Sequence, residues 1–147
     1  MESLRILVVD DSLITVKKLS SMLGLLGHKV IMTAATGKEA LTAYESCNPD
    51  LVTMDITMPD MDGIEATRLI RKRFPDALII MVTSHGQERM VLDALKAGAK
   101  GYVLKPFRQD KLQEAIENAV KRNIRQDKLQ DLVEKNASST PDEDRGS

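Results

Sequence analysis

Five polar residues stand directly after short apolar runs of the sequence, and their types suit one kind of chemistry. Asp10 and Asp11 follow the first run, Asp55 the third, Thr83 the fourth and Lys105 the fifth. Two carboxylates about 4 Å apart repel by on the order of 4 kcal/mol at an effective dielectric near 20, so three that converge need a cation or a proton. Oxygen ligands without His or Cys favour a hard divalent ion, and Mg²⁺ is the expected cofactor.

A carboxylate in such a site can act as a nucleophile toward phosphorus and form an aspartyl phosphate. Lys105 would balance the charge that builds on the transferred oxygens, and the hydroxyl of Thr83 would bond one of them. Each residue alone also has a structural interpretation, as a helix cap, a turn residue or a solvated lysine. Only the complete set predicts a phosphoacceptor site.

The elements that must bring these residues together are five apolar runs. They are rich in Val, Ile, Leu and Met and cover residues 5–9, 29–33, 50–54, 78–82 and 101–104. Successive runs are far enough apart for one crossover helix each, as parallel strands require. The sequence therefore predicts an α/β fold, a doubly wound five-stranded parallel sheet with helices on both faces. Such a sheet places its site at the carboxyl ends of the strands.

Capping-type pairs three residues apart predict helix starts in three segments, 36–39, 62–65 and 84–87. A last helix is expected from about Arg108, with a charge-dense continuation to Val133. We expect one domain over residues 1–125 and an extension of the last helix over 126–135. Residues 136–147 are expected to form a disordered polar tail, because they have too little apolar surface to offset the entropy of ordering.

Length and composition narrow the class of protein. The 147 residues suffice for about one domain, so we expect no second folded module. With 21 basic and 22 acidic residues the net charge is -1, which does not favour direct nucleic-acid binding. The single cysteine, Cys47, excludes an internal disulfide. The apolar run that begins the chain is too short for a signal peptide or membrane span, so we expect a cytoplasmic protein without membrane contact.

Four longer motifs carry a family resemblance. They are Val-Val-Asp-Asp-Ser at 8–12, Met-Asp-Ile-Thr-Met-Pro-Asp-Met-Asp-Gly at 54–63, Val-Thr-Ser at 82–84 and Ala-Gly-Ala-Lys-Gly-Tyr-Val-Leu-Lys-Pro-Phe at 97–107. Over residues 5 to about 125 the sequence resembles a receiver domain of two-component signalling. The resemblance is greatest to the stand-alone response regulators of the chemotaxis type. It implies the flavodoxin-like strand order 2-1-3-4-5.

The resemblance also implies a site and a phosphodonor. Asp55 would accept a phosphoryl group from a sensor histidine kinase. Asp10 and Asp11 would hold Mg²⁺ together with Asp55 and the backbone carbonyl of Thr57. A protein of this kind is not a turnover enzyme, because it supports only its own phosphorylation and dephosphorylation.

The same resemblance implies roles for further residues. Thr83 and Lys105 would contact the phosphoryl group, and Thr83 and Tyr102 would act as the switch. Thr57 and His85 would tune the attack of water on the phosphoryl group, although His85 has the alternative of beginning a helix. A downstream target protein would bind the face formed by the fourth helix, fifth strand and fifth helix. The candidate contacts there are Arg89, Met90, Lys96, Lys100 and Lys121.

Three other functions compete with this interpretation. A phosphatase of the haloacid dehalogenase type would need Asp-x-Asp, and Asp55-Ile-Thr57 lacks the second Asp. An interaction module that is never phosphorylated would retain costly buried carboxylates without use. The receiver fragment of a larger DNA-binding or enzymatic regulator stays open as an alternative.

Overall fold

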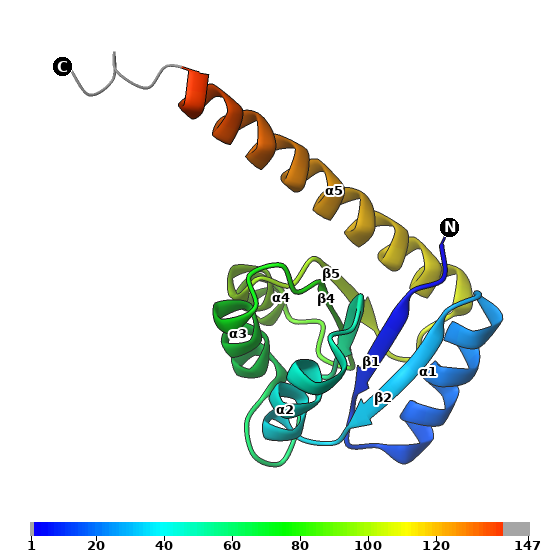
Figure 1. Cartoon of the computed structure of the whole chain (residues 1–147). Helices are drawn as coiled ribbons and strands as arrows, with labels where there is room; N and C mark the ends of the chain where they lie inside the picture. Colours follow the sequence, from blue (N-terminus) through cyan, green and yellow to red (C-terminus); the bar gives the residue numbers. More distant parts are fainter. Residues whose placement is uncertain (1, 140–147) are drawn as a thin grey trace.

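The computed structural model describes residues 2–139. Its five strands form one parallel sheet in the order β2-β1-β3-β4-β5, with helices on both faces (Figure 1). This confirms the predicted fold class and strand order. The elements, in chain order, are β1 (Arg5–Val9), α1 (Leu13–Leu25), β2 (Lys29–Ala34), α2 (Gly37–Cys47), β3 (Leu51–Met54), α3 (Gly63–Arg73), β4 (Ile79–Thr83), α4 (Glu88–Ala97), β5 (Gly101–Leu104) and α5 (Gln109–Ser139).

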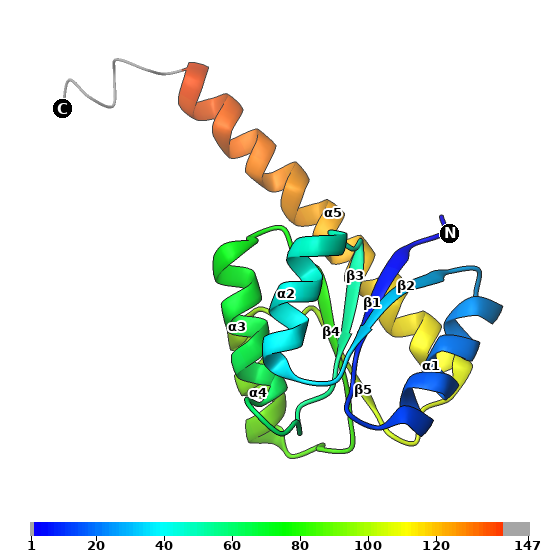
Figure 2. The same cartoon turned by 60° about the horizontal axis from the view of Figure 1, so that its bottom comes forward.

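The sheet separates two apolar clusters, because successive side chains of a strand point to opposite faces. In β1, Leu7 and Val9 belong to the cluster under α2, α3 and α4, whereas Ile6 and Val8 belong to the cluster under α1 and α5. Figure 2 shows the two groups of helices on either side of the sheet. Burial on both faces explains why the strands have nearly continuous apolar sequences.

The predicted strand ends differ from the observed ones by at most one residue. Thr83, expected just after the fourth strand, is the last residue of β4 and pairs with Leu104 in the ladder. Asp10, Asp55 and Lys105 follow directly after β1, β3 and β5, as predicted.

Two of the three predicted helix starts are confirmed. The hydroxyl of Thr36 accepts from the amide of Glu39, and the carboxylate of Asp62 accepts from the amide of Glu65. The prediction for 84–87 is wrong, because α4 begins at Glu88 without a side-chain cap. The backbone of His85 instead bonds to side chains of the neighbouring strands, which holds 84–87 as a loop.

Helix α5 is 31 residues long and projects beyond the sheet (Figure 1). Leu112, Ile116 and Ala119 anchor its first half and are fully buried. The helix covers the predicted extension over 126–135 and continues to Ser139, so the first four residues of the predicted tail are helical. The remaining tail residues, 140–147, lie outside the described residues, and the domain boundary at residue 125 stays a prediction. Within residues 2–139, no helix combines the length and apolar character that crossing a bilayer requires.

Candidate functional site

Three carboxylates meet at the carboxyl edge of the sheet. Asp10 and Asp55 are buried, with 4% and 7% of their surface exposed, and Asp11 is exposed beside them. One oxygen from each of the three lies within 4.8 Å of the others. The ladder fixes this arrangement, because the amide of Asp55 donates to the carbonyl of Val9 at 3.0 Å and so places β3 in register with β1.

Lys105 brings a positive charge to the same place. Its Nζ lies 2.7 Å from Oδ2 of Asp10 and 3.5 Å from Oδ2 of Asp55. The amide of Lys105 donates to the carbonyl of Thr83 at 2.8 Å, which ties the start of the β5–α5 loop to β4. The peptide bond between Lys105 and Pro106 is cis. The structure thus gathers four of the five predicted polar residues into one cluster with Thr83 adjoining them.

The electrostatics of the cluster disfavour a free Asp55 carboxylate. Burial raises the pKa of Asp55, and the negative charge of Asp10 raises it further. Lys105, the hydroxyl of Thr83 and the amide of Ile56 oppose this rise without cancelling it. The pKa of Asp55 therefore lies above its ordinary value, and the site favours an added cation. A donor set made of carboxylate oxygens fits a hard divalent ion such as Mg²⁺.

The loops that follow β3 and β4 contact each other. Oγ1 of Thr57, in the β3–α3 loop, lies 2.6 Å from Nε2 of His85, in the β4–α4 loop. The hydroxyl of Tyr102 donates to the backbone carbonyl of His85, and the amide of His85 donates to Oγ1 of Thr83 at 3.4 Å. Burial and the negative charge of Asp55 raise the pKa of Tyr102. His85 therefore lies in a loop that connects Thr57, Thr83 and Tyr102, and it does not begin a helix.

The sequence interpretation gave no role to Gly63, which sets the geometry behind Asp55. A Cβ at Gly63 would lie 1.9 Å from the carbonyl oxygen of Asp55 and 2.9 Å from Cγ of Met54. The amide of Gly63 donates to the carbonyl of Ile56 at 2.7 Å, which closes the intervening loop. The sequence signal for this role was the pair Asp62-Gly63 at the start of α3.

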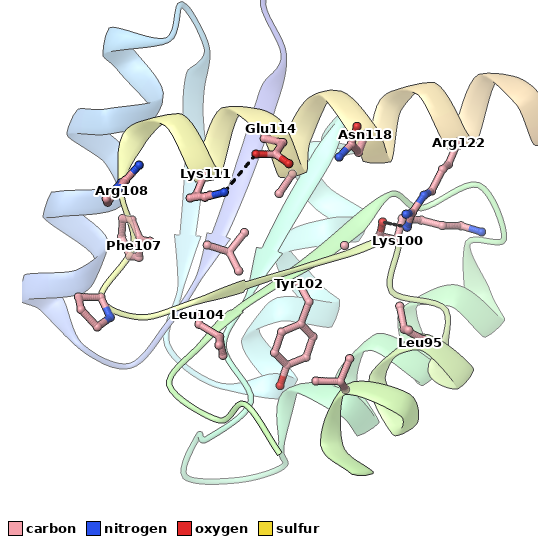
Figure 3. A pocket seen from close by; sticks show the side chains of 15 residues that line it. Leu95, Lys100, Tyr102, Leu104, Phe107, Arg108, Lys111, Glu114, Asn118 and Arg122 are labelled. Atoms are coloured by element: carbon pink, nitrogen blue, oxygen red, sulfur yellow. Dashed lines mark hydrogen bonds and ion pairs between the residues drawn. The ribbon is translucent and has the colours of Figure 1, made fainter. Parts of the chain in front are cut away.

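The face formed by α4, β5 and α5 contains a hollow of about 590 Å³. Leu95 and Tyr102 line one side of it, and Lys111 and Arg122 of α5 line the other (Figure 3). Among the five candidate target contacts, Lys100 lines the hollow and the other four lie outside its lining. The lining combines apolar side chains with four basic residues and one acidic residue, Lys100, Arg108, Lys111, Arg122 and Glu114.

Comparison with known proteins identifies the family. The profile of the response regulator receiver domain matches residues 6–117. The chain is 44% identical over 116 residues to the chemotaxis protein CheY of Bacillus subtilis, covering 79% of this chain and 97% of that protein. The chain belongs to the response regulator receiver family.

Solved structures of receivers agree with this assignment. A CheY-like receiver domain protein of Methanospirillum hungatei is 30% identical, with a TM-score of 0.76 over 85% of this chain and 99% of that one. The match to the Borrelia burgdorferi CheX-CheY-BeF3-Mg²⁺ complex is 40% identical, with a TM-score of 0.74 over 76% of this chain and 85% of that one.

Membership of the receiver family establishes the general activity. Phosphorylation of an aspartate is the general function of receivers, which act in two-component signalling with histidine kinases and downstream targets. Receivers bind Mg²⁺ through an acidic pocket, and the cluster of Asp10, Asp11 and Asp55 could hold such an ion. Receivers are regulators and generally not turnover enzymes.

Proposed function

We propose that Asp55 accepts a phosphoryl group from the phosphohistidine of a sensor kinase, in a site where Asp10, Asp11 and Asp55 hold Mg²⁺. The observation that carries this proposal is the meeting of three carboxylates within 4.8 Å beside the ammonium group of Lys105. The backbone carbonyl of Thr57 is proposed as a further ligand. Bound Mg²⁺ would supply positive charge against the carboxylates and the phosphoryl oxygens.

The side chains of the site perform the remaining steps. A carboxylate oxygen of Asp55 attacks phosphorus, and the bond between phosphorus and the donor histidine nitrogen breaks as the new oxygen–phosphorus bond forms. Lys105 stabilises the charge on the transferred oxygens, and the hydroxyl of Thr83 donates to one of them. Thr57 and His85, whose side chains contact each other at 2.6 Å, control the approach of water to the aspartyl phosphate.

Phosphorylation of Asp55 transmits its signal through a change in the shape of the protein. The phosphoryl group adds roughly one to two negative charges at pH 7, which draws Thr83 and Lys105 toward Asp55. Movement of Thr83 leaves space for Tyr102; in the structure without a phosphoryl group, the hydroxyl of Tyr102 bonds to the carbonyl of His85. The inward state of Tyr102 remodels the face of α4, β5 and α5, where a downstream target protein binds. The expected mechanism is a population shift between two states in a cytoplasmic protein.

The experiment that tests this function uses a small acyl phosphate as donor. The protein and Asp55→Asn are incubated with donor and Mg²⁺, and intact mass is recorded. We expect the unmodified sequence to gain one phosphoryl group and Asp55→Asn to gain none. An equal gain in both proteins, or no gain in either, would overturn the assignment of Asp55.

A further inference from the structure

The β3–α3 loop, residues 55–62, is attached to a different part of the fold through Asp60. The two carboxylate oxygens of Asp60 accept from two successive amides of α2. Oδ1 accepts from Gly37 at 2.8 Å, and Oδ2 accepts from Lys38 at 2.9 Å. These amides belong to the first turn of α2, where backbone donors have no partner within the helix. One side chain therefore connects the loop after Asp55 to a helix more than twenty residues earlier in the chain.

The contact is close as well as polar. A Cβ at Gly37 would lie 2.1 Å from Cγ of Met61 and 3.3 Å from its carbonyl oxygen, so the loop backbone rests against the helix start. Desolvation raises the pKa of Asp60, but the hydrogen bonds from the amides of Lys38 and Gly37 outweigh this effect. The pKa of Asp60 therefore lies below its ordinary value. Asp60 is therefore a carboxylate at neutral pH, and both oxygens are available as acceptors.

The same loop carries Thr57 at the edge of the phosphorylation site. One end of the loop is closed by the bond from the amide of Gly63 to the carbonyl of Ile56, and Thr57 itself contacts His85. The contact of Asp60 with α2 is a third attachment, on the side away from His85. With attachments on both sides of the loop, the position of Thr57, two residues after Asp55, is constrained.

We propose that Asp60 is a positioning residue, which holds Thr57 against the carboxylate cluster by fastening the β3–α3 loop to the first turn of α2. Asp60 does not touch the site and acts only through Thr57. Its loss lets the loop move, which weakens Mg²⁺ binding and changes the lifetime of the phosphoryl group on Asp55. The inference rests on the proposed function, because it takes Thr57 to border the Mg²⁺ and phosphoryl positions.

The test compares Asp60→Ala with a matched control at the same helix end. Oε2 of Glu39 accepts from the amide of Ala35 at 2.8 Å, so Glu39→Ala also weakens the start of α2 but leaves the loop attached. Mg²⁺ affinity is measured by calorimetry on each unphosphorylated protein, and phosphoryl lifetime is measured by intact mass after donor removal. Asp60→Asn, which keeps one carbonyl acceptor, supplies a milder variant that retains the fold.

We expect Asp60→Ala to bind Mg²⁺ about tenfold more weakly, as is usual when a group that orients a metal site is lost. Asp60→Asn should fall between Asp60→Ala and the unmodified protein, and Glu39→Ala should keep the original affinity and lifetime. Unchanged Mg²⁺ affinity in Asp60→Ala, or equal weakening in Glu39→Ala, would overturn the proposal. If the unmodified protein binds Mg²⁺ but takes no phosphoryl group, the proposed function fails, and the calorimetry still decides the role of Asp60.

Discussion

Lys105 forms ion pairs with two buried carboxylates, Asp10 and Asp55, so its removal should destabilise the protein strongly. One oxygen of Asp10 lies within 4.8 Å of one oxygen of Asp55, and Lys105→Met removes the positive charge that balances these two carboxylates. At that distance two unit charges repel by about 3.5 kcal/mol or more at an effective dielectric near 20. Breaking a buried ion pair by removing one partner typically costs about 3–5 kcal/mol. We therefore expect the free energy of unfolding to fall by about 3 kcal/mol without divalent ions.

The assay is urea unfolding in the presence of a chelator, with two companion variants. Lys105→Met combined with Asp55→Asn should recover most of the loss, because only one of the two buried carboxylates remains charged. Lys111→Met removes an exposed lysine that lies 3.6 Å from Glu114, and should cost less than about 1 kcal/mol. A loss in Lys105→Met as small as that in Lys111→Met, or no recovery in the double variant, would refute the electrostatic reasoning.

Three further predictions concern stability and its dependence on pH. Gly63→Ala should destabilise by about 1–3 kcal/mol or more, seen as a lower urea midpoint, because its Cβ would overlap the carbonyl oxygen of Asp55. Thr53→Val should stabilise by about 1 kcal/mol in the same assay, because Oγ1 of Thr53 is buried without a hydrogen-bond partner among the described residues; a loss of stability would contradict this. Burial lowers the pKa of His28 from its ordinary 6.5, so the unfolded chain binds the proton more readily and stability should fall as pH drops below 6.5. Unfolding measured against pH should show a weaker fall over that range in His28→Asn, and an identical fall would contradict this role.

Much of the site could be predicted because parallel strands follow a simple rule. Once the apolar runs are recognised as strands of one sheet, their carboxyl ends must share an edge, and Asp10, Asp55 and Lys105 are then neighbours. The hydrogen bond from the amide of Asp55 to the carbonyl of Val9 aligns the carboxyl ends of β3 and β1 in this way. The resemblance to receivers added the roles, which spacing alone does not provide.

The features of the site that could not be predicted lie in its loops. Nothing in the local sequence shows that His85 uses its backbone to bond Thr83 and Tyr102, and so the sequence pattern at 84–87 predicts a helix cap that the structure does not contain. The contact of Asp60 with α2 is equally hidden, because 22 and 23 residues separate the partners. Side chains that bond to distant backbone groups leave no periodic pattern.

The central claim is that Asp55 is the residue that carries the phosphoryl group. The most direct measurement is reduction of the phosphorylated protein with borohydride, which converts an aspartyl phosphate to homoserine, followed by peptide mapping. We predict homoserine at position 55, formed only when both the acyl phosphate and Mg²⁺ were present. Homoserine at position 10 or 11, or at position 55 to the same extent without Mg²⁺, would contradict the account.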